Sequence, residues 1–171
     1  MDTFLAIASR RDERRYRPEP LQAGTVERIL DAGRLSGSAR NRQPWLFVIP
    51  ESDERRAELA ASVYVPENVL TASFVVCVAV TGRGPVAFDA GRATQNMLLA
   101  AWNEGVSSCP NGLADAERAS RALELSEDEV PQIVLSFGLP GRTRAAEERS
   151  PAEWSERANR RPLVDVVRRL S

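Results

Sequence analysis

Apolar and polar positions alternate in blocks along the chain of 171 residues, and these blocks predict helices and strands in turn. Residues 73–80, SFVVCVAV, are apolar after the first serine and rich in β-branched side chains, which is typical of a strand buried on both faces. The longest predicted helix covers about residues 86–104. Its NMLLAAW segment is apolar nearly all the way round, and Gly105 ends it. We expect this helix to be central.

The remaining blocks are shorter. The expected helices cover residues 4–8, 25–35, 52–63, 115–125 and part of the tail from residue 150, and the expected strands cover residues 45–50, 106–109 and 132–138. Thr25 and either Ser52 or Asp53 are the expected N-caps. Trp45 and Trp102 are expected in the core. The pattern predicts a mixed α/β or α+β domain, in which helices surround a few-stranded sheet.

Composition narrows the function classes. The chain is 43% hydrophobic and 27% charged, and its formal net charge of -1 argues against a general affinity for nucleic acid or anionic membranes. No apolar run reaches the ~20 residues of a membrane helix. The start, MDTFLAIA, begins with an acid and leads at once into SRRDERR, which is unlike a signal peptide. Cys77 and Cys109 form no Cys-x-x-Cys pair. We therefore expect a cytoplasmic protein with reduced thiols.

The chain contains neither histidine nor lysine, so all 23 basic residues are arginine. Codon bias is a sufficient explanation for the missing lysine, but the chemical consequence is the same. Nucleophile systems that use histidine, histidine metal sites, Schiff-base lysines and the lysine of a phosphate-binding P-loop are all excluded. If the protein is an enzyme, a bound cofactor that needs only positioning fits this composition best.

One apparent cofactor motif has two interpretations. The segment GRGPVA, residues 82–87, has the form G-x-G-x-x-A of a dinucleotide fingerprint. However, Pro85 lies inside the supposed tight turn, and the acid about 20 residues further on, Glu104, lies at the end of a helix rather than at the tip of a strand. These departures favour a surface turn.

The stretch SRRDERRYRPEP, residues 9–20, contains five arginines. Arg10, Arg11 and Arg14 could bind a phosphate, because each planar guanidinium gives bidentate contacts and stays charged at any working pH. Two arginines near the other end of the chain, Arg160 and Arg161, could join them. The alternative is a solvated surface in which neighbouring acids pair with the arginines. The residues of this stretch alone leave both interpretations open.

Several segments, taken in order, resemble the FMN-dependent nitroreductase family. They are the arginine stretch, then GSARNRQPWLFV at residues 37–48, DAGRATQNMLLAAWNEGVSSCPNG at 89–112, PQIVLSFGLP at 131–140 and RANRRPLVDVV at 157–167. The resemblance implies an α+β fold with a small mixed or antiparallel sheet, flanked by helices, and a long central helix at a dimer interface. It also implies a single FMN-binding domain over residues 1–171.

The resemblance further implies the activity and its partners. Members of the family take hydride from NADH or NADPH and reduce nitroaromatics, quinones or similar conjugated acceptors by a ping-pong mechanism. They are homodimers with two FMN sites at the interface. No catalytic acid, metal, nucleic acid or membrane partner is expected for this chain.

The resemblance places cofactor-binding roles on particular residues. The FMN phosphate is expected at Arg10, Arg11 and Arg14, completed by Arg160 or Arg161. The partner subunit is expected to approach the flavin ring with Ser38, Asn41 and Gln43. The backbone N–H groups of Asn111 and Gly112 are expected at the N5 and O4 edge of the flavin, and Asn68 beside the ribityl chain.

The chain departs from the family pattern at Asp12, where many members have serine. An acid therefore lies near the expected phosphate, and the Asp12 carboxylate could orient the arginines. Flavin-consuming members share an Arg-Arg-Asp start, which leaves an oxygen-dependent flavin-cleaving activity as an alternative. From a different class, the arginine-rich ends could belong to a nucleic-acid-binding module, whose binding would weaken steeply with salt.

Overall fold

The computed structural model describes residues 1–142 and 145–170. The chain divides into a larger compact unit, residues 11–143, and a smaller one that joins residues 1–10 to residues 144–171. We describe each unit by itself, over its described residues. The single FMN-binding domain over residues 1–171 stays a prediction.

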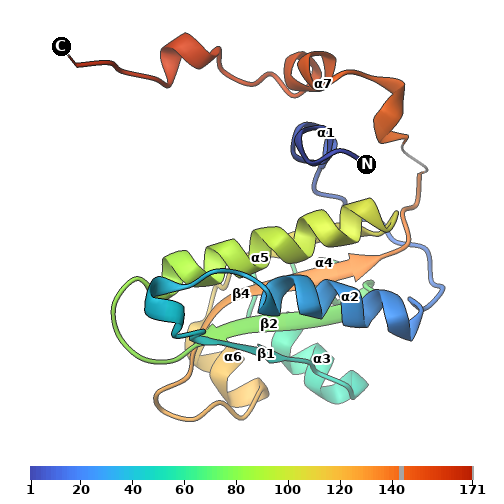
Figure 1. Cartoon of the computed structure of the whole chain (residues 1–171). Coiled ribbons are helices and arrows are strands. Elements are labelled where there is room, and N and C mark those ends of the chain that lie inside the picture. Colours follow the sequence, from blue (N-terminus) through green and yellow to red (C-terminus); the bar gives the residue numbers. More distant parts are fainter. Residues whose placement is uncertain (143–144, 171) are drawn as a thin grey trace. The chain divides into compact units, whose positions relative to one another are not determined.

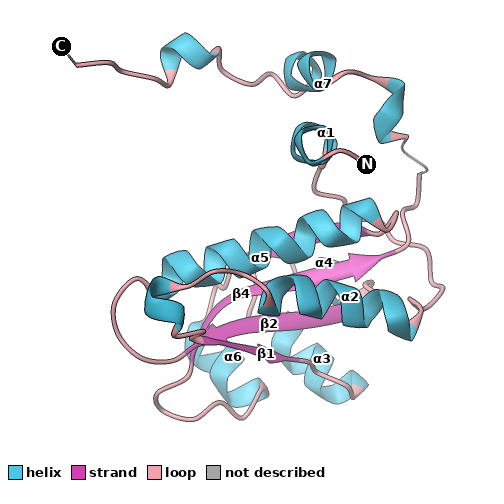
Figure 2. Cartoon of the chain, viewed as in Figure 1, coloured by secondary structure: helices cyan, strands magenta, loops and turns pink. Residues whose placement is uncertain are grey.

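A four-stranded sheet forms the centre of the larger unit (Figures 1 and 2). Its strands are β1 (Trp45–Val48), β2 (Phe74–Val80), β3 (Ser107–Asn111) and β4 (Val130–Gly138), in the order β1-β2-β4-β3. Every neighbouring pair is antiparallel. The sheet therefore lacks the parallel β-α-β unit of a dinucleotide-binding fold, and residues 82–85 form bends before the next helix, as the surface-turn interpretation expected.

One face of the sheet is covered by α2 (Ala23–Arg34) and α5 (Val86–Asn103), which lie side by side in Figure 1. Successive side chains of a strand point to opposite faces, and the alternate residues Val76, Leu135 and Phe137 pack here against Ile29 and Met97 of the helices. The helix predicted over residues 86–104 is thus confirmed as central. Gly105, with φ +73°, ends it in the left-handed conformation that glycine tolerates.

The opposite face carries the short helices α3 (Asp53–Ala60), α4 (Glu67–Leu70) and α6 (Ala116–Ala122). Leu59, Val69 and Ala119 of these helices pack against Val75 and Val134 of the strands. All seven residues of β2 are buried, which confirms the prediction of a strand covered on both sides. The fold is α+β with a small antiparallel sheet, as expected.

Several predicted bounds and one predicted cap needed correction. Helix α3 ends at Ala60 rather than at residue 63, α6 ends at Ala122 rather than at 125, β1 ends at Val48 rather than at 50, and β4 begins at Val130 rather than at 132. Helix α2 begins at Ala23 rather than at Thr25, so Thr25 is not its N-cap; Gln22 holds that position. Strand β3 continues through Pro110 to Asn111, beyond the predicted end at residue 109. Proline is acceptable there because β3 is an edge strand, where a missing N–H group need not interrupt a ladder. The prediction of Ser52 as an N-cap is confirmed, because its hydroxyl accepts from the Arg55 N–H at 3.1 Å.

The smaller unit contains α1 (Thr3–Ser9), α7 (Pro151–Arg157) and two short 3-10 turns, Ala146–Glu148 and Leu163–Asp165. Helix α1 packs against α7. A capping box begins α7: the Ser150 hydroxyl accepts from the Glu153 N–H at 3.4 Å, and the Glu153 carboxylate accepts from the Ser150 N–H at 2.8 Å. The Ser150 hydroxyl also donates to this carboxylate, and these bonds lower the pKa of Glu153. The indole of Trp154 is buried and donates to the Ala146 carbonyl at 2.8 Å. Over the described part of the chain, none of the helices is both long and apolar enough to cross a bilayer.

Candidate functional site

The arginine segment, residues 11–17, is held against the sheet by backbone pairing. Near its start, Asp12 forms a parallel bridge with Ser108 of β3, and the Glu13 N–H donates to the Ser108 carbonyl at 3.1 Å. Towards its end, Tyr16 bridges to Pro140, just after β4. This pairing fixes the backbone that carries Arg11, Asp12 and Arg14. Arg11 is half-buried, while Asp12 and Arg14 are exposed.

The predicted residues Asn68 and Asn111 meet on the same side of the larger unit. Helix α4 brings the side chain of Asn68 within 2.9 Å of the Asn111 side chain, where the Asn68 Nδ2 donates to the Asn111 Oδ1. Both residues are buried. Gly112 follows at once, and its carbonyl accepts from the Tyr64 N–H at 3.2 Å. A Cβ atom on Gly112 would lie 3.3 Å from the Tyr64 ring, a tight contact that a small shift of this exposed ring would relieve.

The three residues expected to approach a partner's flavin lie in one tight loop, residues 38–43. The Ser38 carbonyl accepts from the Asn41 N–H at 3.0 Å, and its hydroxyl accepts from the Gln43 N–H at 2.8 Å. The loop is anchored to α5 by the buried Asp89, whose carboxylate accepts from the Ala39 N–H at 3.1 Å. The structure therefore brings Ser38, Asn41 and Gln43 together.

This loop is also strained. Arg40 and Gln43 have φ values of 54° and 50°, in the left-handed region that residues other than glycine, asparagine and aspartate rarely adopt. Asn41, with φ 54°, lies in the same region at lower cost. Strained backbone of this kind is concentrated at binding and catalytic sites, where the surrounding structure enforces it. The strain is an independent sign that the geometry of this loop matters.

The remaining predicted residues, Arg10, Arg160 and Arg161, belong to the smaller unit. The Arg160 N–H donates to the Ser155 carbonyl at 3.1 Å, after the end of α7. The Arg161 guanidinium donates to the Asp165 carbonyl at 2.7 Å. Their role at a phosphate stays a prediction from the family resemblance.

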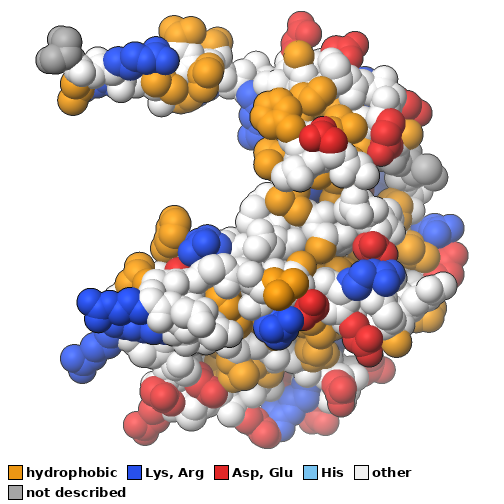
Figure 3. Space-filling view, viewed as in Figure 1, with side chains coloured by type: hydrophobic (Ala, Val, Ile, Leu, Met, Phe, Trp, Pro, Cys, Tyr) orange, Lys and Arg blue, Asp and Glu red, His pale blue; other side chains and the backbone are white. Residues whose placement is uncertain are grey.

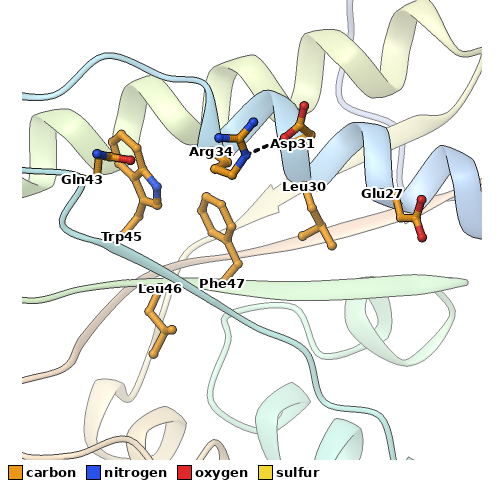
Figure 4. Close-up of a pocket in the computed structure, with 8 residues that line it drawn as sticks. All are labelled: Glu27, Leu30, Asp31, Arg34, Gln43, Trp45, Leu46 and Phe47. Atoms are coloured by element: carbon orange, nitrogen blue, oxygen red, sulfur yellow. Dashed lines mark hydrogen bonds and ion pairs between the residues drawn. The ribbon is translucent and has the colours of Figure 1, made fainter. Parts of the chain in front are cut away.

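A groove of about 580 Å³ runs between α2 and the edge strand β1 (Figure 4). Its residues are Glu27, Leu30, Asp31, Arg34, Gln43, Trp45, Leu46 and Phe47. Figure 4 shows the rings of Trp45 and Phe47 turned towards α2, with Leu46 pointing the other way, as strand alternation requires. Arg34 donates to Asp31 at 2.6 Å on the rim. Of the predicted cofactor-binding residues, this groove contains Gln43.

Both cysteines are free and buried. Burial raises the pKa of the Cys77 thiol to about 12, because a thiolate would lose its hydration in the core. The Cys109 thiol donates to the Pro110 carbonyl at 3.4 Å and is 1% exposed. Within the described residues, no group of three or more cysteine and carboxylate side chains is placed to hold a metal ion.

Sequence reasoning overlooked Tyr16, Tyr64 and Ser136. The hydroxyl of Tyr16 lies 3.0 Å from the Ser136 hydroxyl, which is also 3.0 Å from the amide nitrogen of Asn111. A signal was present for Ser136, since it is the polar residue inside the apolar strand QIVLSFG. A buried polar side chain in such a strand needs a hydrogen-bond partner, and this need points to a network.

Comparison with known proteins decides the family. The family model described as "Nitroreductase family" matches residues 7–69 and 67–139. The chain belongs to the nitroreductase family.

Relatives and solved structures of nitroreductases agree with this assignment. The chain is 29% identical over 149 residues to a Methanothermobacter thermautotrophicus protein named "Putative NADH dehydrogenase/NAD(P)H nitroreductase", covering 82% of this chain and 78% of that relative. A crystal structure titled "putative nitroreductase in complex with fmn", from Desulfovibrio desulfuricans, is 28% identical, with a TM-score of 0.83 over 100% of this chain and 98% of that one. A nitroreductase family protein from Clostridium difficile has the same fold, with a TM-score of 0.83, 18% identity and coverage of 100% and 99%.

Proposed function

We propose that this nitroreductase-family protein binds FMN and uses NADH or NADPH to reduce a nitroaromatic, a quinone or a similar conjugated acceptor in a ping-pong cycle. One observation carries the proposal: the arginine segment pairs with Ser108 at one end of β3, and Asn111 and Gly112 lie at the other end. A short strand thus joins a cationic segment to a turn with backbone donors. The crystal structure of the Desulfovibrio relative in complex with FMN supports the choice of cofactor.

The residues of the larger unit fit the two ends of FMN. Arg11 and Arg14 would bind the phosphate through charge-assisted hydrogen bonds, and Asp12 between them would orient the guanidinium groups. The backbone N–H groups of Asn111 and Gly112 would donate to the ring edge. Arg10, Arg160 and Arg161 keep the phosphate-binding role that the family resemblance implies.

Bound FMN would supply the atom that accepts hydride and later passes electrons on. The chain itself would supply position and electric field: cations at the phosphate, backbone donors at the ring edge, and the Tyr64 ring beside Gly112 to shield that edge from water. A mechanism in which the cofactor supplies the reactive atom and the chain only positions it suits a sequence with no histidine and no lysine. The cytoplasm is the proposed location.

The test is the visible absorption spectrum of the purified protein after FMN is added and the unbound excess removed. We expect retained flavin bands that NADH or NADPH bleaches without oxygen and that a quinone or nitroaromatic then restores. Flavin bands that disappear irreversibly in air, with no acceptor turnover, would favour flavin cleavage instead. A protein that cannot retain FMN would refute the proposal, and salt-sensitive binding of nucleic acid by such a protein would replace it.

We further propose that the protein is a homodimer in which the loop 38–43 of each subunit completes the partner's site. Figure 3 shows hydrophobic side chains on the surface of the C-terminal tail. The large aliphatic side chains exposed along this tail and next to the loop are Leu163, Val164, Val166, Val167 and Leu170 in the tail and Leu35 before the loop. Exposed apolar groups in one stretch of tail indicate a surface that a partner covers.

Subunit complementation tests this arrangement. We would mix an Arg11→Ala/Arg14→Ala variant with an Asn41→Ala/Gln43→Ala variant and allow the subunits to exchange. Each mixed dimer then has one site with both parts intact, so random exchange restores about a quarter of the wild-type sites. Recovery of reductase activity on mixing supports the shared site. No recovery, when native mass spectrometry shows that mixed dimers have formed, would mean that each loop serves its own subunit.

A further inference from the structure

Four polar side chains from separate segments of the larger unit form one hydrogen-bond network. They are Tyr16 of the arginine segment, Asn68 of α4, Asn111 of β3 and Ser136 of β4. The last three are 6%, 4% and 0% exposed. Burying so many polar groups is unfavourable unless they are paired, so the network is a constraint on geometry rather than a simple source of stability.

Asn111 lies at the centre of the network. Its amide nitrogen is 3.0 Å from the Cys109 carbonyl, 3.1 Å from the Val134 carbonyl and 3.0 Å from the Ser136 hydroxyl, while its amide oxygen accepts from Asn68. The side chain is therefore fully engaged inside the protein. What Asn111 and Gly112 can offer a ligand is their backbone, and the inward-facing side chain fixes where that backbone lies.

Ser136 connects Tyr16 to β3 through both its hydroxyl and its carbonyl. The Ser136 hydroxyl has one proton, which it donates to the Cys109 carbonyl at 3.2 Å. The Tyr16 hydroxyl donates to the Ser136 carbonyl at 3.2 Å and also lies 3.0 Å from the Ser136 Oγ. Burial raises the pKa of Tyr16 well above its usual value, so the phenol keeps this proton at physiological pH. Hydrogen bonds thus connect Tyr16 through Ser136 to the backbone of Cys109.

Tyr16 also fixes the arginine segment. Its neighbour Arg17 donates its N–H to the Leu139 carbonyl at 2.9 Å, and the Gly141 N–H donates to the Arg15 carbonyl at 3.1 Å. The Tyr16 side chain lies directly on Gly138, where any Cβ atom would come within 2.8 Å of it. The tyrosine is thus packed as well as hydrogen-bonded, two residues after Arg14.

We infer that Tyr16 and Ser136 are positioning residues, which hold the phosphate-binding arginines and the flavin-facing backbone of Asn111 and Gly112 in a fixed register. This inference rests on the proposed FMN site. The network joins the two ends of that site through side chains that need not touch the cofactor. Because the arginines and the backbone of Asn111 and Gly112 would be held at a fixed spacing, one FMN molecule could contact both groups at once. Binding would then be stronger, because neither group loses conformational entropy when FMN binds.

The test compares wild type with Tyr16→Phe, Ser136→Ala and the double variant. We expect each single substitution to raise the Kd for FMN about tenfold. The double variant should raise the Kd by less than the product of the two single effects, because both substitutions remove the same contact between the Tyr16 and Ser136 hydroxyls. At saturating FMN, Tyr16→Phe should also change the visible absorption and circular dichroism of the bound flavin ring, although Tyr16 belongs to the arginine segment.

Ser62→Ala is the matched control, since Ser62 is equally buried and its hydroxyl donates at 2.6 Å to Leu59, one turn back. It should leave the Kd and the flavin spectrum unchanged. If wild type binds FMN but Tyr16→Phe and Ser136→Ala bind it with wild-type affinity and spectrum, the positioning role is wrong. The positioning role would also be wrong if the two substitutions reduced the affinity for FMN additively and left the flavin spectrum unchanged. If wild type itself does not bind FMN, the proposed function fails first, and the two failures are distinguishable.

Discussion

Replacing Arg11 and Arg14 together by alanine is expected to raise the Kd for FMN about 100-fold, which removes flavin from the purified protein. The physical reason is the loss of two charge-assisted contacts to a dianionic phosphate. Arg11 is half-buried beside β3, so its attraction is screened less by water than that of Arg14. Fluorescence quenching of added FMN measures the affinity directly, and equilibrium dialysis checks it.

Riboflavin provides the internal comparison, because it lacks the phosphate. Wild type and the double variant should bind riboflavin with equal, weak affinity. Arg118→Ala/Arg121→Ala, which removes the same charge from exposed positions on α6, should bind FMN as wild type does. A variant that binds riboflavin more weakly than wild type would place the two arginines elsewhere than at the phosphate. An undiminished affinity for FMN would leave them as a solvated surface.

The elements with strong local signals were predictable. β2 is an apolar run of mostly β-branched residues, which is typical of a buried strand. α5 has a long apolar pattern and is followed by Gly105, so the hydrophobic pattern and the glycine indicate the same helix and the same end. Short α4, Glu67–Leu70, was not predicted, since four residues are too few to show a helical period. The order and antiparallel pairing of the strands depend on contacts between distant segments, which periodicity does not record.

The candidate site divides in the same way. Residues such as Arg11 and Asn111 could be named because the family resemblance gives them by position. Ser136 and Tyr16 are linked by a bond that spans 120 residues of sequence, and nothing in the local pattern pairs them. The strain at Arg40 and Gln43 was equally hidden, because neither residue type indicates a positive φ.

Phe137→Ala is expected to lower the free energy of unfolding by about 3–5 kcal/mol. Phe137 is fully buried on the α2–α5 side of β4, with its ring centroid 5.5 Å from that of Phe74. Removing the ring opens a cavity between sheet and helices that the close-packed core refills only in part. For a chain of this length, the melting temperature should fall by roughly 10 °C, measured by calorimetry or circular dichroism.

The Phe137→Ala variant should be less stable than wild type but should bind FMN almost as tightly. Ser136, the preceding residue, points to the opposite face of β4, where its hydroxyl contacts Asn111 and Tyr16. The folded Phe137→Ala protein should therefore bind FMN within about twofold of wild type, whereas Ser136→Ala should lose about tenfold. Glu127→Ala, at an exposed position in the turn before β4, is the control and should change the unfolding free energy by less than about 0.5 kcal/mol. If Phe137→Ala weakened FMN binding as much as Ser136→Ala, the two faces of β4 would act as one unit, and the distinction between core and site along this strand would be wrong.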